Sequence, residues 1–265
     1  MKKTTECIET LHVLGIALIR LPIKKLKLSR LDFDLIYKLG IDDSMIQDIL
    51  EIFRDDLISK ESGNSIIPLE QFSVYINFFV DDYLNKIILI YLLEKNAQYL
   101  LFYKHSRYLI TQFNNRHSLE QITKFIIDTV KIPKAKNISG IFIVSVSGCP
   151  LLTKINERRS DIIQSDVQIS GFLTALHLFS EEVITKDSVA KLKEINFGNQ
   201  MIFTIMKHDI IFAFLVSNKT FLMERYMYLI ADEFIKKYKE DLIGFDGDVA
   251  RFKSFNDLIE KYFDV

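Results

Sequence analysis

The residue types that most often carry out chemistry in proteins are present in this chain, but their spacing matches no common reaction centre. The five histidines are widely separated, and none belongs to an HExxH motif or has a second histidine four residues away, as helical zinc sites require. Neither Cys7 nor Cys149 lies in a CxxC motif. The chain also lacks the GxxxxGK, GxGxxG and GxSxG motifs. We therefore expect no catalytic residues, no metal ligands and no cofactor, and a protein that is neither an enzyme nor itself a GTPase.

Two smaller patterns have ordinary explanations. Asp246-Gly247-Asp248 begins like a calcium-binding loop, but the later carboxylates and the terminal glutamate are missing, so a turn followed by a helix cap is predicted. Cys7 and Cys149 could form one disulfide. Two reduced thiols are the simpler expectation, because disulfides are rare in the cytosol.

A basic stretch near the N-terminus is the clearest charge pattern. No acidic residue occurs between Thr10 and Leu31, and leucine and isoleucine alternate with the cations in this stretch. Such a segment could contact an anionic membrane or an acidic partner. It could equally be an edge strand that lysine protects from aggregation. The cations that would make the contact are Arg20, Lys24, Lys25, Lys27 and Arg30.

The composition limits the class of protein. The chain has 265 residues, 49% of them hydrophobic, and a net charge of −1 from 34 basic and 35 acidic residues. This is enough apolar material for a complete core in one or two domains, and it gives no reason to expect nucleic-acid binding. The longest uncharged stretch, 137–153, contains Pro150 and two glycines, so it cannot be a membrane helix. We expect a soluble, cytoplasmic protein, with peripheral membrane contact left open.

The first half of the chain shows strand and helix signals in a definite order. Strands are predicted at 11–19, 25–28, 72–80 and 87–93. An amphipathic helix follows Asp42, and Ser118-Leu119-Glu120-Gln121 fits a capping box that opens another helix. The aromatic segment 97–113 could be a hairpin or a helix, and the helix is favoured slightly.

The second half has the same order of elements after the segment 131–137, which contains one proline, three lysines and no acid. Strands are predicted at 140–147, 151–155, 192–196, 200–206 and 210–216. Helices are predicted over 167–182, along a stripe from Met223 to Tyr238 that ends before Gly244, and over 255–262. The inward positions expected in the first of these helices are Ile169, Phe172, Leu173, Leu176 and Phe179. The prediction is an α+β protein with two domains, 1–132 and 138–265, each an antiparallel sheet of about five strands flanked by helices.

This order of elements resembles a known family. The hairpin from Gly140 to Leu151, the helix around 169–175, the three-strand meander and the long C-terminal helix resemble a longin or roadblock-type domain. The first half is similar to the first domain of tandem-longin proteins through 86–93, the next helix and 118–121. The whole chain resembles small longin-domain proteins of archaea, especially the Asgard group. The resemblance implies a cytoplasmic, non-catalytic platform that binds small Ras-like GTPases, other longin domains or vesicle-trafficking machinery.

A helix with small residues is the candidate contact for such a partner. Small side chains beside large apolar ones allow close approach of another chain, although packing on the domain's own sheet explains the same pattern. Homo- or hetero-oligomers both remain open. A small-molecule sensor of the PAS or GAF type is the alternative function and requires an enclosed pocket. A nucleic-acid-binding protein is a further alternative, which the neutral charge disfavours. The candidate partner-binding residues are Ser170, Gly171, Thr174 and His177.

Overall fold

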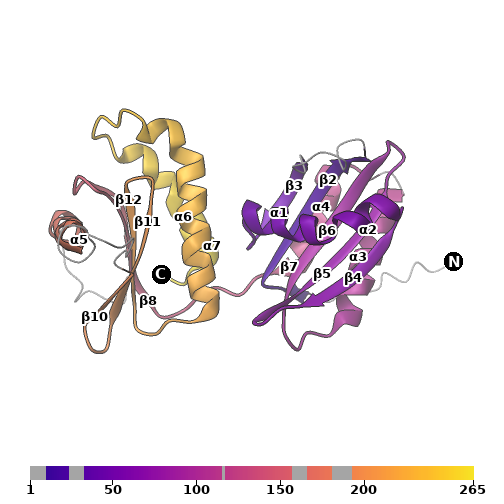
Figure 1. The fold of residues 1–265 in the computed structure, drawn as a ribbon, viewed down its shortest axis with the longest axis horizontal. Helices are drawn as coiled ribbons and strands as arrows, with labels where there is room; N and C mark the ends of the chain where they lie inside the picture. Colours follow the sequence, from indigo (N-terminus) through magenta and orange to yellow (C-terminus); the bar gives the residue numbers. More distant parts are fainter. Residues whose placement is uncertain (1–9, 24–32, 115–116, 157–165, 181–192) are drawn as a thin grey trace. The chain divides into compact units, whose positions relative to one another are not determined.

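The computed structural model describes residues 10–23, 33–114, 117–156, 166–180 and 193–265. The chain divides into two compact units, Met1–Pro133 and Lys134–Val265. Each unit contains one five-stranded antiparallel sheet with helices, and the described residues form seven α-helices in all (Figure 1). The α+β class and the two antiparallel sheets predicted from the sequence are therefore confirmed.

The N-terminal unit is built on strands in the order β3-β2-β6-β5-β4. The central strands β2, β5 and β6 are buried along almost their whole length, because helices cover both faces of the sheet (Figure 1). A short parallel pair, β1 (Leu11–His12) with β7 (Val130–Lys131), joins the two ends of the unit. The sheet strands are β2 (Gly15–Pro22), β3 (Asp34–Leu39), β4 (Gly63–Pro68), β5 (Phe72–Val80) and β6 (Asn85–Glu94).

Two helices lie on each face of this sheet, α1 (Asp43–Ile52) and α2 (Arg54–Ser59) on one and α3 (Tyr99–Asn114) and α4 (Leu119–Thr129) on the other (Figure 1). The sequence signals at their starts act as expected. The Asp42 carboxylate accepts a hydrogen bond from the Met45 amide at 2.8 Å. Ser118 and Gln121 form the predicted capping box.

Several details of the N-terminal unit differ from the sequence prediction. The strand expected at 11–19 is divided into β1 and β2, and the aromatic segment 97–113 forms helix α3. Strands β3 and β4 were not anticipated, and the segment 25–28 lies outside the described residues. Both β3 and β4 are edge strands with few fully buried residues, so they lack the apolar alternation by which strands are recognised.

The C-terminal unit has strands in the order β10-β11-β12-β8-β9. Helix α5 (Asp166–Phe179) covers one face, while α6 (Phe221–Leu242), the 3-10 helix η3 (Ala250–Phe255) and α7 (Asn256–Tyr262) cover the other (Figure 1). The sheet strands are β8 (Ile138–Ser145), β9 (Pro150–Ile155), β10 (Glu194–Asn196), β11 (Met201–Lys207) and β12 (Ile210–Val216).

The two faces of this second sheet have different cores. The face under α6 and α7 is aromatic, with Phe212 packed against Phe234 and Phe214 against Phe263. The face under α5 is a mainly aliphatic cluster that also includes Phe142, and Leu173 is the buried contribution of the helix to it.

The two units share one topology. Numbered from the first strand of each sheet, both place the strands in the order second, first, fifth, fourth, third. In both, one helical segment follows the second strand, and two helices follow the fifth. The chain is therefore a structural tandem repeat, although no residue-level repeat is visible in its sequence.

Candidate interaction site on helix α5

Helix α5 turns a mostly polar side toward its own sheet. Its buried residues are Ser170, Leu173, Thr174 and His177, of which only Leu173 is apolar. Leu173 packs against a cluster that includes Phe142 and Val144. A helix on a sheet normally buries its apolar stripe, so this orientation is unusual.

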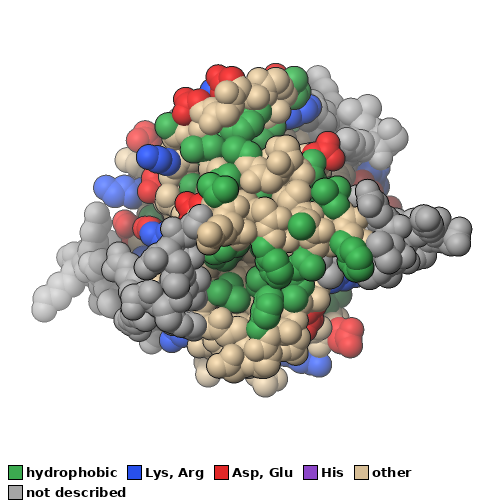
Figure 2. Space-filling model, turned by 90° about the vertical axis from the view of Figure 1, so that its left-hand side faces the viewer, with side chains coloured by type: hydrophobic (Ala, Val, Ile, Leu, Met, Phe, Trp, Pro, Cys, Tyr) green, Lys and Arg blue, Asp and Glu red, His purple; other side chains and the backbone are tan. Residues whose placement is uncertain are grey.

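The opposite side of α5 is apolar and open to solvent. The exposed fractions are 67% for Val167, 44% for Phe172, 45% for Leu178 and 56% for Phe179. Phe197, which follows β10 and is 52% exposed, places its ring 6.4 Å from that of Phe172. Hydrophobic side chains gather on the face of the molecule on which α5 lies (Figure 2). We call Val167, Phe172, Leu178, Phe179 and Phe197 the α5 apolar surface.

This orientation corrects the sequence prediction for the helix. Leu173 is buried as expected, and Ile169 and Leu176 are half-buried. Phe172 and Phe179, which were expected to face the sheet, are instead exposed. The prediction was wrong because apolar residues occur on all sides of this helix, and helical periodicity then does not select one face.

The buried side of α5 carries hydroxyl groups that its surroundings do not satisfy. Ser170 Oγ and Thr174 Oγ1 are buried and have no hydrogen-bond partner within the described part of the chain. A buried hydroxyl without a partner costs about 1–3 kcal/mol. Helix α5 therefore gains less from its contact with the sheet than a helix with an apolar inner side.

Packing among the described residues does not require glycine at position 171. A Cβ atom placed there would meet none of their atoms within 4 Å. Glycine in a helix costs about 1 kcal/mol relative to alanine. Together with the exposed Ala175 it forms a flat strip between the larger side chains of the α5 apolar surface.

The structure separates the four candidate partner-binding residues. Ser170, Thr174 and His177 are buried between α5 and the sheet and cannot contact a partner while the helix has this position. Only Gly171 lies on the exposed side. Sequence reasoning missed the residues that are accessible, although the apolar content on both sides of the helix was a signal that one side is left uncovered.

The structure describes only part of the basic N-terminal stretch. Lys24, Lys25, Lys27 and Arg30 lie outside the described residues. Arg20 lies on β2, where its guanidinium donates a hydrogen bond from Nε to Asp34 Oδ2 at 3.2 Å. This pair joins two neighbouring strands, which is a structural role.

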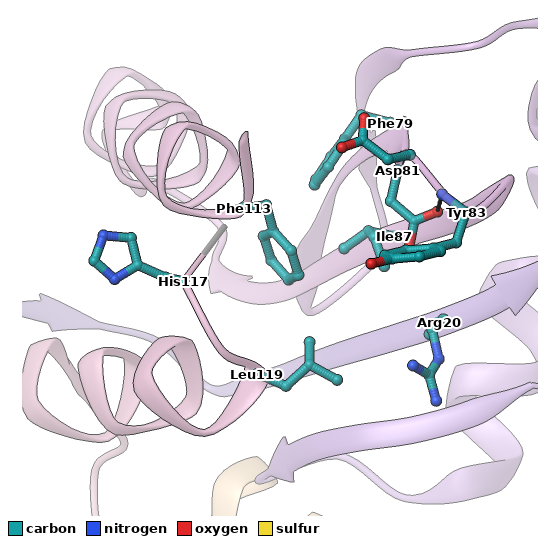
Figure 3. A pocket seen from close by; sticks show the side chains of 9 residues that line it. Arg20, Phe79, Asp81, Tyr83, Ile87, Phe113, His117 and Leu119 are labelled. Carbon is teal, nitrogen blue, oxygen red and sulfur yellow. Dashed lines mark hydrogen bonds between the residues drawn. The ribbon is translucent and has the colours of Figure 1, made fainter. Parts of the chain in front are cut away.

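Arg20 also lies at the edge of a pocket of about 500 Å³ in the N-terminal unit (Figure 3). The Asp81 carboxylate accepts hydrogen bonds from the backbone amides of Tyr83 and Asn85, at 2.9 and 2.8 Å, and so closes the β5–β6 turn. The His117 ring points away from the other lining side chains (Figure 3). The charged groups that line the pocket are thus largely bonded to other groups of the chain, and they do not converge on a ligand. The lining residues are Arg20, Phe79, Asp81, Asp82, Tyr83, Ile87, Phe113, His117 and Leu119.

A buried polar network in the same unit contains a histidine, His105, whose pKa is strongly lowered. Thr129 Oγ1 donates to the Phe125 carbonyl at 2.7 Å and therefore accepts from His105 Nε2 at 2.9 Å. His105 Nδ1 then accepts from the Tyr91 hydroxyl at 2.9 Å. Burial lowers the pKa of His105 to about 4 and raises the pKa of Tyr91. These pKa values keep both side chains neutral near neutral pH. The hydrogen bonds of the network join β6, α3 and α4.

Possible metal sites and membrane-spanning helices were the remaining candidates for function. No group of three or more potential metal ligands occurs among the described residues. At the calcium-like sequence, Arg251 contacts both carboxylate oxygens of Asp246, at 2.8 and 3.0 Å, and the Asp248 carboxylate accepts from the Ala250 amide at 2.9 Å. The aspartates thus form the predicted turn. The predicted helix cap is not found, because Val249 stands at the N-cap of the 3-10 helix η3 and no side chain caps it. Within the described part of the chain, no helix has the length and hydrophobicity needed to cross a bilayer.

Comparison with known proteins gives no relative. No protein-family model matches the chain, and no curated protein matches its sequence.

Proposed function

We propose that this protein is a non-catalytic interaction platform of the longin type, which binds a small Ras-like GTPase or a partner of the vesicle-trafficking type. The order of elements on which the longin resemblance depends is strand, strand, helix, three strands and two helices. Both units have this order.

The observation that carries the proposal is the α5 apolar surface. Scattered exposed apolar residues are common on proteins, but a group on one helix and the adjoining strand end is typical of an interaction site. The Phe172 and Phe179 side chains are 44% and 56% exposed to solvent. Covering either ring would contribute about 1 kcal/mol, roughly half of the transfer free energy of a whole phenylalanine side chain. A partner that covered both rings and Val167 would gain about 3 kcal/mol from them, a central apolar contribution to which the surrounding contacts of the interface would add.

The polar groups of the pocket in the N-terminal unit favour a protein-binding function over a small-molecule sensor. A sensor requires polar groups that converge on an enclosed pocket. In the N-terminal pocket, Arg20 is paired with Asp34, and Asp81 closes a turn. The polar groups of this pocket are therefore used to hold the unit together.

A binding experiment with two variants tests the proposal. The full chain is immobilised and offered purified Ras-like GTPases of the source organism, each loaded with GDP or with a non-hydrolysable GTP analogue. We expect one nucleotide form to bind and Phe172→Glu to weaken that binding at least tenfold, because a charge would be buried in an apolar contact.

Ile243→Glu is the matched control. Ile243 is a large apolar residue, 70% exposed, in the same unit but outside the α5 apolar surface. It should leave binding unchanged. Equal binding of both nucleotide forms, no binding, or equal loss in the two variants would contradict the proposal.

A further inference from the structure

The outward side of helix α3, in the N-terminal unit, combines aromatic and basic residues. No acidic residue occurs from Lys95 to His117. Leu100 is 63% exposed, and Tyr103 and Tyr108 are each 39% exposed. Lys104 and Arg107 are exposed between them. We call Leu100, Tyr103, Lys104, Arg107 and Tyr108 the α3 basic surface.

The inner side of α3 fixes this orientation firmly. Phe102, His105, Ser106 and Leu109 are all buried. His105 is bonded to Tyr91 of β6, and Ser106 Oγ accepts from Asn77 Nδ2 of β5 at 3.0 Å. Because these bonds hold the helix to two strands, α3 cannot rotate to cover its outward side, and the α3 basic surface is a rigid part of the unit.

The cations of the α3 basic surface lack partners of opposite charge. Arg20, Arg54 and Arg251 each form an ion pair with a nearby carboxylate. Arg107 and Lys104 form none with any carboxylate of the described residues, and the Arg107 guanidinium instead lies 6.0 Å from the centre of the Tyr103 ring. An arginine held on an aromatic ring presents its donors in a fixed direction that suits a carboxylate.

The number and type of these residues favour one class of partner. Basic patches that bind anionic membranes use about 4–8 lysines or arginines, and nucleic-acid sites require a larger basic stripe. The α3 basic surface has two cations, with tyrosine and arginine as the residue types that dominate the energetics of protein interfaces. We propose that it is a docking surface for an acidic segment of a partner protein. The carboxylates of that segment pair with Arg107 and Lys104, and an apolar side chain covers Leu100 and Tyr103.

A direct binding measurement tests this proposal. The probe is a fluorescently labelled random copolymer of glutamate and tyrosine, titrated with the full-length protein at low ionic strength and followed by anisotropy. We expect saturable binding that Arg107→Glu weakens about tenfold, the loss expected for one charge-assisted contact. Tyr103→Ala should weaken it by a smaller factor, because the ring positions Arg107.

Lys239→Glu is the control for charge alone. Lys239 is an exposed lysine at the end of α6, in the other unit, and its reversal changes the net charge equally. It should change binding less than about twofold, because Lys239 is not part of the α3 basic surface and its reversal alters only the net charge. Equal loss in Lys239→Glu and Arg107→Glu, or full binding by Arg107→Glu, would overturn the proposal. Circular dichroism melting should be the same for wild type and Arg107→Glu, because the replaced side chain is exposed.

Two further probes test the other classes of partner, which are an anionic membrane and a nucleic acid. Vesicles that contain phosphatidylserine and a single-stranded oligonucleotide are offered under the same conditions. If either binds more tightly than the copolymer and loses binding in Arg107→Glu, the acidic-protein proposal is wrong. The Phe172→Glu variant should bind the copolymer normally, so a failure at the α3 basic surface is distinguishable from a failure of the proposed function at α5.

Discussion

Replacing Thr174 with valine should stabilise the C-terminal unit. Thr174 is 8% exposed, and its hydroxyl has no partner in the described part of the chain. Valine has nearly the same shape and carries a methyl group in place of the hydroxyl. Removing a buried, unpaired hydroxyl returns about 1–3 kcal/mol. Allowing for the partial exposure, we expect the free energy of unfolding to rise by about 1–2 kcal/mol.

The same substitution at Thr129 should have the opposite sign. The Thr129 hydroxyl donates to the Phe125 carbonyl and accepts from His105 Nε2. Thr129→Val removes both bonds and leaves a buried N–H of His105 without an acceptor. The expected loss is about 2–3 kcal/mol in the N-terminal unit. The two variants make the same chemical change at a threonine whose hydroxyl is bonded and at one whose hydroxyl is not.

Amide hydrogen exchange followed by mass spectrometry separates the two effects. Exchange of β12 reports the opening of the C-terminal unit, and exchange of β6 reports that of the N-terminal unit. Thr174→Val should slow exchange in β12 and leave β6 unchanged, whereas Thr129→Val should speed exchange in β6 alone. A destabilised β12 in Thr174→Val would refute the reasoning, because Thr174 would then have a hydrogen-bond partner and α5 a different orientation.

The remaining predictions concern pH, glycine and a surface charge. The His105 pKa of about 4 lies below the usual histidine value of 6.5, so this residue's contribution to stability is complete above pH 6.5 and is lost as the pH falls toward 4. Exchange of β6 should therefore show a loss of about 3 kcal/mol over that range, and stability that stays constant down to pH 4 would contradict the burial of a neutral His105. Gly171→Ala should stabilise by about 0.5–1 kcal/mol, since nothing lies within 4 Å of the new methyl group. Gly40→Ala should destabilise by more than about 1 kcal/mol, because Gly40 has φ +66° and the new Cβ would lie 2.5 Å from the Leu14 carbonyl oxygen. Thermal melting of these two variants checks both signs, and a stabilised Gly40→Ala would contradict the close approach at that turn. Arg107→Glu should leave the melting temperature unchanged while it weakens binding of the acidic copolymer.

The parts of the fold that the sequence predicted are those that depend on local signals. Strands β5 and β6 are long, almost wholly buried runs of apolar residues, and the helix starts at Asp42 and Ser118 depend on residues only three positions apart. Edge strands β3 and β4 gave no such signal, because partly exposed strands tolerate polar residues on both faces.

The candidate site was less predictable because it depends on contacts between distant residues. The choice of inner side for α5 is made by the sheet and the surrounding chain, and a helix with apolar residues on all sides gives no local preference. The bond between Tyr91 and His105 joins residues 14 positions apart, and that between His105 and Thr129 joins residues 24 positions apart. A sequence shows each of these residues but not which others will face it.

Binding of Ras-like GTPases to the full chain is the most direct test of the central claim, that the α5 apolar surface is a protein-binding site. Affinity for the GDP and GTP-analogue forms is measured for wild type, Phe172→Glu and Ile243→Glu. We expect one nucleotide form to bind wild type and the Ile243→Glu control equally well, and to bind Phe172→Glu at least tenfold more weakly. Equal or absent binding of the two nucleotide forms, or full binding by Phe172→Glu, would contradict a binding role for this surface.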